Sequence, residues 1–237
     1  MPAASASKTA VIIVNTGSPA APTKEALAQY LLEFLGDRRV VELNPLIWQP
    51  ILRGIIIPRR SEASAQRYKT VWTKDGSPLM AISAKTAAAM QKALGEAFCV
   101  SWAMCYGTHR VAEVIAKAAQ AAPERIVILP MFAQYATQTT EAVYDAVDRA
   151  VKKNPIGSEI LRIRSYHNHP LYIEALAAGV RRHWEQAGAL GEKGKVLMSF
   201  HGIPQASSDR GDPYEAQCRQ TAALLAQKLG LKDEQYE

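Results

Sequence analysis

Residues 9–19 read Thr-Ala-Val-Ile-Ile-Val-Asn-Thr-Gly-Ser-Pro, and this stretch decides the fold. Its first six residues form an apolar, β-branched run that predicts a buried strand. The Asn-Thr-Gly-Ser-Pro segment that follows predicts a turn. A helix should then cover residues 24–35, with Thr23 as its N-cap. A buried strand that leads through a tight turn into a helix indicates the first unit of a parallel α/β sheet.

The same alternation continues along the chain. Further strands are predicted at 98–104, 125–129, 159–163 and 195–199, and further helices at 82–94, 111–122, 140–152, 170–186 and 213–229. This order predicts α/β architecture with two Rossmann-like, doubly wound parallel sheets. A Lys-Asn-Pro-Ile-Gly linker at 153–157 divides the chain into a first domain (1–157) and a second domain (158–237). The second domain should be incomplete, because two strands are too few to make a sheet buried on both faces.

The composition is that of an ordinary globular protein. The 237 residues are 48% hydrophobic and 21% charged, with a formal net charge of +6, which argues against disorder and favours an anionic partner. A long basic run and an aromatic-interleaved basic patch are both absent, so we expect no nucleic-acid partner. The first seven residues lack the apolar core of a signal peptide, and the three cysteines lack metal-cluster spacing. We therefore expect a cytoplasmic location.

A second informative stretch, residues 196–204, reads Val-Leu-Met-Ser-Phe-His-Gly-Ile-Pro. It predicts a short buried strand that Gly202 and Pro204 end, with His201 just past the strand. Ligands of open α/β sheets bind at the carboxyl ends of strands. An imidazole there can bind a metal or accept a proton. A packed, hydrogen-bonded histidine explains the position equally well.

The motifs around His201 resemble those of a known family. Ser-Phe-His-Gly-Ile-Pro at 199–204, followed by Arg-Gly-Asp-Pro-Tyr at 210–214, resembles the signature of ferrochelatases, which insert ferrous iron into a porphyrin during haem biosynthesis. The resemblance implies that His201 coordinates the metal and accepts a pyrrole proton. It also implies protoporphyrin IX and ferrous iron as substrates, and no organic cofactor.

Other segments resemble the porphyrin-binding loops of the same family. They include the Asn-x-Gly-x-Pro loop at 15–19, the Leu-Leu-Glu-Phe-Leu segment at 31–35, and the Gly-Ser-Pro-Leu loop at 76–79. Each segment also has a simpler explanation. The leucines of 31–35 can pack in the core, Ser77 can be a helix N-cap, and Arg59 and Arg60 can lie on a solvated helix face. The porphyrin-binding residues implied by the resemblance are Thr16, Leu31, Phe34, Arg60, Ser77, Tyr106, Phe132 and Tyr135. Of these, Leu31 and Phe34 would form an apolar lip, and Arg60 and Ser77 would meet propionates.

The chain departs from the family pattern at several positions. Cys105 stands where the family has arginine, and Phe132 stands where it has tyrosine. Cys105 fits either a soft metal contact or, more simply, a small buried hydrophobe. His167 and His169 form a weak candidate for a metal pair, because they lie two residues apart in a connection.

The family continues beyond the position that matches Glu237, with a segment that bears a glutamate opposite the histidine. The resemblance thus implies that the C-terminal quarter to third is lacking. Two alternatives follow: a tetrapyrrole-binding protein without activity, or a chelatase for another metal or for coproporphyrin. Thr16 stands where some family members carry tyrosine, and this part of the resemblance favours protoporphyrin over coproporphyrin. The apolar lip also predicts peripheral contact with the inner membrane.

Overall fold

The computed structural model describes residues 9–191 and 194–237, so the N-terminal segment 1–7 of the sequence analysis lies outside the described residues. The chain forms two compact units, which are described separately. The first comprises Met1–Phe132 and Thr137–Arg164, and the second comprises Ala133–Ala136 and Ser165–Glu237.

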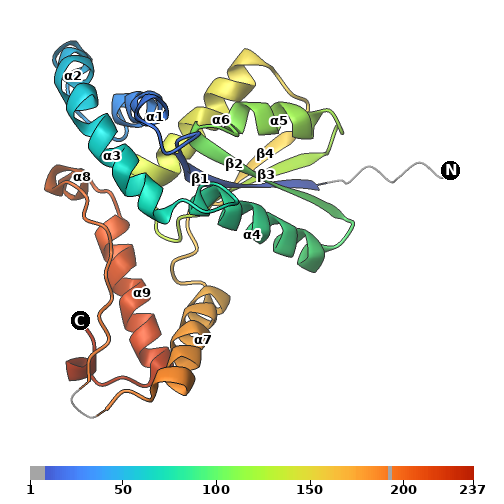
Figure 1. Ribbon diagram of the computed structural model, residues 1–237. Helices are drawn as coiled ribbons and strands as arrows, with labels where there is room; N and C mark the ends of the chain where they lie inside the picture. The colour runs from blue at the N-terminus through green and yellow to red at the C-terminus, as the bar shows by residue number, and fades with distance from the viewer. Residues whose placement is uncertain (1–8, 192–193) are drawn as a thin grey trace. The chain divides into compact units, whose positions relative to one another are not determined.

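The first unit contains a four-stranded parallel sheet. Its strands are β1 (Thr9–Ser18), β2 (Phe98–Gly107), β3 (Arg125–Pro130) and β4 (Glu159–Arg162), in the order β2-β1-β3-β4. Every neighbouring pair is parallel. The α/β class with a parallel sheet is therefore confirmed (Figure 1). β1 lies in the interior of the sheet, which accounts for its nearly unbroken apolar sequence.

Helices connect these strands. Between β1 and β2 the chain forms α1 (Lys24–Gly36), α2 (Pro45–Ile51), a π-helical turn (Leu52–Ile56), α3 (Ile57–Val71) and α4 (Pro78–Leu94). α5 (Val111–Ala119) joins β2 to β3. A second π-helical turn (Thr137–Glu141) and α6 (Ala142–Lys153) join β3 to β4.

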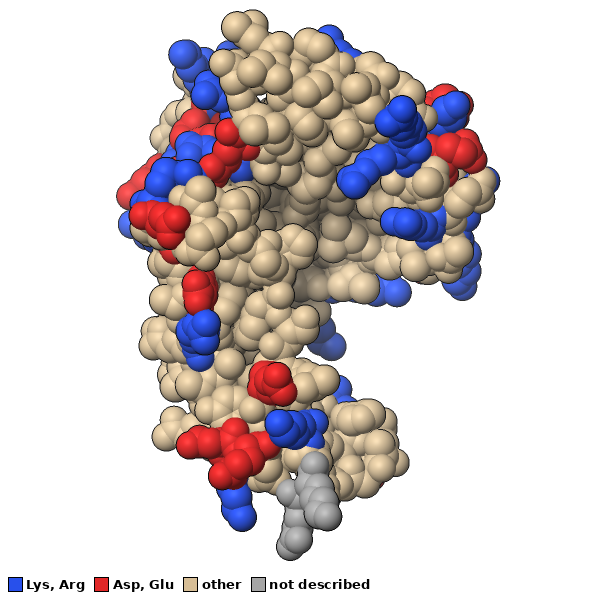
Figure 2. All heavy atoms as spheres, turned by 90° about the vertical axis from the view of Figure 1, so that its left-hand side faces the viewer, with Lys and Arg blue, Asp and Glu red and all other residues tan. Residues whose placement is uncertain are grey.

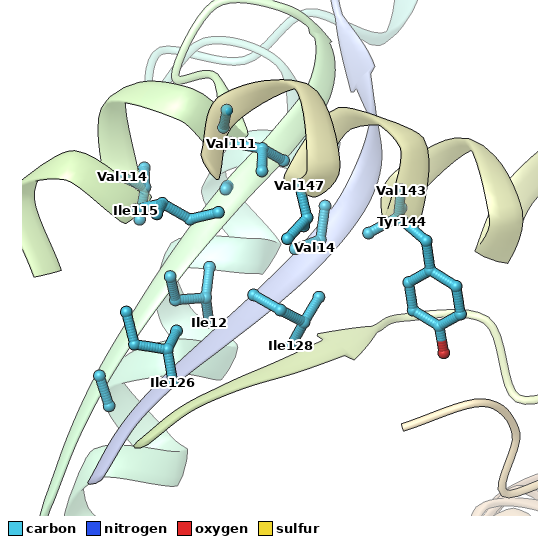
Figure 3. Close-up of a cluster of buried hydrophobic side chains, with 13 residues drawn as sticks. Ile12, Val14, Val111, Val114, Ile115, Ile126, Ile128, Val143, Tyr144 and Val147 are labelled. Atoms are coloured by element: carbon cyan, nitrogen blue, oxygen red, sulfur yellow. The ribbon is translucent and has the colours of Figure 1, made fainter. Parts of the chain in front are cut away.

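The main core lies between the sheet and helices α5 and α6 (Figure 3). Alternate residues of the strands face these helices, as the two-residue period of a strand requires. α4 covers the opposite face of the sheet (Figure 1). The residues at the centre of the α5–α6 core are Ile12, Val14, Ile126, Ile128, Val111, Ile115, Val143 and Val147.

The strand expected to open the second half of the chain lies instead in this first sheet. β4 pairs with β3 in parallel, from Arg125↔Glu159 to Ile128↔Arg162. The reason is local, since α6 packs its apolar face on the core and returns the chain beside β3. An ion pair between Arg125 and Glu159 accompanies the first pairing.

The second unit consists mainly of helices α7 (Pro170–Ala187), α8 (Gln205–Asp209) and α9 (Tyr214–Leu229), with a short 3-10 turn (Asp233–Gln235) near its end. α7 and α9 pack against each other. Thr221 on α9 donates a hydrogen bond from Oγ1 to the carbonyl oxygen of His167 at 2.9 Å, and the Gln134 amide donates to Thr221 Oγ1 at 2.9 Å. These contacts join residues 133–136 and 165–169 to α9.

The prediction of a buried strand at 195–199 is wrong. Val196 forms an isolated parallel bridge with Tyr236, and the N–H of Met198 donates to the carbonyl of Glu237 at 2.7 Å. The side chain of Leu197 is 75% exposed. The segment has the hydrogen-bonding capacity of a strand, but residues 235–237 provide its ladder, and no layer of helices covers Leu197 within the described part of this unit.

Surface charge does not gather in one run on the face drawn in Figure 2, where basic and acidic side chains lie next to each other in several places. Across residues 9–191 and 194–237, we find no helix with the length and apolar character needed to cross a membrane.

Candidate active site

The carboxyl ends of β1 and β2 approach each other unusually closely. Gly17 pairs with Tyr106 and Ser18 pairs with Gly107. Both glycines have positive φ, and a Cβ at Gly17 would lie 2.2 Å from the carbonyl oxygen of Tyr106. A Cβ at Gly107 would lie 2.2 Å from the carbonyl oxygen of Ser18. Only glycine fits at either position, and the 15–19 loop and Tyr106 therefore share one edge of the sheet.

An aromatic cluster lies next to this edge. The Phe34 ring stacks on Tyr30, with 5.9 Å between centroids, and meets the Tyr106 ring edge-on at 5.4 Å. The Tyr30 hydroxyl donates to the carbonyl of Gly17 at 3.3 Å. Three of the predicted porphyrin-binding segments, which contain Thr16, Phe34 and Tyr106, are thus brought together.

The Tyr106 phenol is held in a polar contact at the base of this cluster. Its hydroxyl donates to Oδ2 of Asp37 at 2.9 Å, and the side chain is 6% exposed. Burial raises the pKa of Tyr106 far above its ordinary value, and Cys105 and Asp37 add to the rise. The phenol is therefore neutral at physiological pH and supports the edge as a hydrogen-bond donor.

The expected difference in burial along α1 is present. Leu27 is fully buried, whereas Leu31 and Phe34 are partly exposed and pack against the edge of the same cluster. Helical spacing places all three on one side of α1, and the side chains nearest the sheet edge retain the exposed surface. This geometry suits an apolar lip as well as ordinary packing.

The predicted propionate residues differ in accessibility. Arg60 is exposed on α3 and forms no ion pair with any residue in the described ranges. Ser77 directly precedes α4 but is only 4% exposed, and its side chain makes no capping hydrogen bond. Thr16 is half-buried, and its N–H donates to Asn15 Oδ1 at 3.0 Å. Arg60 is the member of this group whose charged atoms are open to a ligand.

Phe132 and Tyr135 fall in different units. Phe132 ends the first segment of unit 1 and packs against the main core. Tyr135 belongs to the second unit, is largely buried, and donates its N–H to Gln217 Oε1 at 2.7 Å. The two aromatics therefore have different surroundings, although the sequence presents them as one loop.

His201 lies in the second unit, at the mouth of a cavity of about 230 Å³. Its side chain is exposed, and no described residue forms a hydrogen bond or ion pair with the imidazole. The alternative that His201 is a packed, hydrogen-bonded histidine is therefore wrong. The cavity is lined by Phe200, His201, Gly202, Ile203, Gln205, Ser208, Tyr214, Glu215 and Cys218.

Two residues of this cavity were missed as site residues in the sequence analysis. Tyr214 and Cys218 are four residues apart on α9 and line the same cavity as His201. Burial raises the pKa of Tyr214 to about 12, the neighbouring Cys218 adds to the rise, and the His201 backbone opposes it. The signal was available, because the Gly-Asp-Pro-Tyr motif opens a helix and i, i+4 positions share a helix face.

The proposed histidine pair does not come together as a metal site. His167 is buried with its Nε2 2.8 Å from Gln220 Oε1, and the Nδ1 of His169 accepts from the N–H of Leu171 at the start of α7. No group of three metal-binding side chains is placed to hold an ion among the residues that the structure describes.

Cys105, the other candidate for a metal contact, is a packed side chain. Burial raises the pKa of the Cys105 thiol to about 12, and Cys105 packs against both hydrophobic clusters. It is thus a neutral, largely apolar side chain.

Comparison with known proteins gives a consistent result. The sequence model of a family described as Ferrochelatase matches residues 8–237. Proteins named Ferrochelatase from Aliivibrio fischeri (strain MJ11), Aeromonas hydrophila and Stenotrophomonas maltophilia (strain R551-3) are 44%, 46% and 45% identical to the chain. The alignments cover 96–97% of this chain and 69–71% of each relative.

The parallel sheet, with its loops at the carboxyl edge of the strands, is that of an α/β protein, and the family match makes this α/β protein a chelatase. More specifically, the chain belongs to the ferrochelatase family, whose members insert iron into a porphyrin in haem biosynthesis.

Proposed function

We propose that this protein inserts ferrous iron into protoporphyrin IX, with His201 as the metal ligand and acceptor of a pyrrole proton. The observation that supports this role is the exposed imidazole at the mouth of the cavity, which has no competing partner among the described residues. Neutral imidazole is a suitable ligand for divalent iron, and the same group can take up a proton. No organic cofactor takes part in this proposal.

The porphyrin is proposed to bind at the sheet edge of the first unit. Phe34 and Tyr106 offer aromatic surface there, and Thr16 belongs to the glycine-containing loop beside them. Arg60 carries an exposed guanidinium, which can bind a propionate through two parallel hydrogen bonds. Ser77, Leu31 and Phe132 complete the proposed set in this unit, and the burial of Ser77 requires local movement before its hydroxyl reaches a ligand. Tyr135 is a further proposed porphyrin contact and belongs to the second unit.

Metal insertion tests the role of His201. His201→Ala and His183→Ala should be compared in the full chain, because His183 is an exposed histidine on α7 outside the cavity. We expect His201→Ala to abolish insertion of ferrous iron while porphyrin binding, followed by absorbance, stays unchanged. Insertion that survives in His201→Ala would overturn the assignment. Binding by the wild-type chain without insertion would favour a tetrapyrrole-binding protein instead.

Porphyrin titration tests the propionate site. Arg60→Ala should weaken binding about 5- to 30-fold, which corresponds to the loss of a charge-assisted hydrogen bond of roughly 1–2 kcal/mol. Arg67→Ala on the same helix is the matched control, since it removes an equally exposed arginine. Equal affinities in the two variants would reject Arg60. Parallel titrations with coproporphyrin, and insertion assays with cobalt, test the remaining alternatives.

The proposed location is the cytoplasm, with peripheral contact between the lip residues Leu31 and Phe34 and the inner membrane. Their partial exposure supports this proposal. Co-sedimentation with anionic vesicles tests it, and Phe34→Ser should reduce the bound fraction. Equal sedimentation of the wild type with and without vesicles would reject membrane contact.

A further inference from the structure

Residues 201–214 form a loop whose two ends, His201 and Tyr214, line the same cavity. Between these ends the chain forms α8, and the loop is closed by its own hydrogen bonds. The N–H of Ser207 donates to the carbonyl of Pro204 at 2.9 Å, and the N–H of Asp212 donates to the carbonyl of Ser207 at 3.1 Å. The Asp212 carboxylate then accepts from the N–H of Tyr214 at 3.0 Å, at the first residue of α9. The start of α9 is thereby fixed relative to α8.

His201 itself lies in a segment without regular secondary structure. The parallel ladder with residues 235–237 extends to Met198, three residues before the histidine. Hydrogen bonding resumes at Pro204, three residues after it. Gly202 adds conformational freedom immediately next to the imidazole. A contact in the middle of this span is needed if the imidazole is to keep one orientation.

Tyr214 provides such a contact. Its side chain is partly buried in the cavity that His201 lines, and it interacts there with the His201 backbone and with the Cys218 thiol. Cys218 lies one helical turn further along α9 and is buried. The phenol therefore lies between a rigid helix and the irregular segment that carries the histidine.

We propose that Tyr214 is a positioning residue that holds the His201 segment against α9 and thereby orients the imidazole for metal binding. This inference rests on the proposed role of His201 as the metal ligand. Tyr214 does not touch the metal in this proposal. Its hydroxyl acts through the His201 backbone, and Cys218 orients the hydroxyl from the helix side.

The test follows the His201 imidazole directly in the full chain labelled with ¹⁵N-histidine. Co²⁺ is the probe, because a paramagnetic ion broadens the signal of an imidazole that binds it. His201→Ala identifies the His201 signal. In Tyr214→Phe, which keeps the ring and removes the hydroxyl, we expect half-broadening of the His201 signal to require about 5- to 10-fold more Co²⁺, as the loss of one hydrogen bond would give. Porphyrin affinity should stay unchanged.

Two further variants make the result specific. Tyr166→Phe removes a hydroxyl from the same unit, outside the cavity, and should bind Co²⁺ as the wild type does. Cys218→Ala should raise the required Co²⁺ concentration in the same direction as Tyr214→Phe, but by a smaller factor. It also provides the test if Tyr214→Phe does not fold. Thermal unfolding of each variant separates a local effect from a general loss of structure.

The outcomes distinguish the two proposals. The His201 signal is the one that is missing from the spectrum of His201→Ala. If Co²⁺ does not broaden this signal in the wild type, the role of His201 as a metal ligand is overturned. If Co²⁺ broadens the His201 signal equally in the wild type, Tyr214→Phe and Cys218→Ala, His201 remains a ligand and the positioning role of Tyr214 is overturned. Equal weakening in Tyr166→Phe would also overturn it, because the effect would then not depend on the cavity.

Discussion

The hydroxyl of Tyr106 donates a hydrogen bond to Oδ2 of Asp37 across 2.9 Å, and this contact joins the carboxyl end of β2 to the residue that ends α1. The other carboxylate oxygen of Asp37 accepts from the N–H of Arg39 at 2.8 Å. Arg39 in turn pairs with Asp145 on α6 at 2.7 Å. The aromatic cluster at the sheet edge is therefore supported by a chain of polar contacts from three elements.

Removal of the Tyr106 hydroxyl should weaken this support. Tyr106→Phe keeps the ring against Phe34 but leaves one oxygen of Asp37 without its donor. We expect the free energy of unfolding to fall by about 1 kcal/mol, because the acceptor left without its donor is only partly buried. Urea denaturation measures this change. Unaltered stability would show that water replaces the hydroxyl without cost.

The close approach of β1 and β2 predicts a large effect of a single methyl group. Gly17→Ala combines positive φ with a Cβ that would lie 2.2 Å from the carbonyl oxygen of Tyr106, and should cost more than about 3 kcal/mol of unfolding free energy. Gly54→Ala is the control, because a Cβ there meets nothing within 4 Å. That helical replacement should be neutral or stabilising by up to about 1 kcal/mol. Similar thermal midpoints in the two variants would contradict the described geometry.

Burial decreases from Leu27 to Leu31 along α1, so substitutions at the two positions should affect different properties, stability at Leu27 and porphyrin binding at Leu31. Leu27→Ala should destabilise the protein by about 2–5 kcal/mol, because its side chain is fully buried. Leu31→Ala should cost distinctly less, because its side chain is partly exposed, and should weaken porphyrin binding more than Leu27→Ala does in folded protein. Urea unfolding and porphyrin titration on the same samples check both statements. A stability loss for Leu31→Ala as large as that for Leu27→Ala would mark Leu31 as core.

The buried Cys105 thiol predicts loss of stability in alkali. Burial raises its pKa from 9.0 to about 12, so the folded chain retains a proton that the unfolded chain loses. The free energy of unfolding therefore falls as the pH rises through this window, by at most about 1.4 kcal/mol per pH unit for this group. Cys105→Ala should reduce the slope of stability against pH between 9 and 11. Cys99→Ala, which removes an exposed thiol, is the matched control.

The sequence was sufficient to predict three strands of the sheet, β1, β2 and β3, because they are buried by elements close to them in the chain. β1 and β3 are short apolar runs, and the helices that follow cover them. The prediction of a buried strand at 195–199 is wrong because burial depends on which other elements cover a segment. An apolar run does not specify those covering elements. β4 was assigned to the wrong half because neither its sequence nor the linker at 153–157 specifies a pairing partner.

The candidate site was predictable where a motif is contiguous. Thr16 and Tyr106 were singled out from separate motifs, and the parallel register places both strand ends at one edge. Tyr214 was quoted in a motif but not recognised as a neighbour of His201, because its position depends on the fold of the residues between them. The burial of Ser77 also could not be predicted, since a serine before a helix is usually an exposed cap.

The reciprocal approach of Gly17 and Gly107 has a consequence for how the sheet assembles. Each glycine lies opposite a carbonyl group of the other strand, and this match exists in one alignment of β1 and β2. A slip by one residue would bring the Cβ of Thr16 or Ser18 to the place where Gly17 has none. The two glycines therefore favour this alignment of the strands over a pairing shifted by one residue, at the end of the sheet where a ligand would bind.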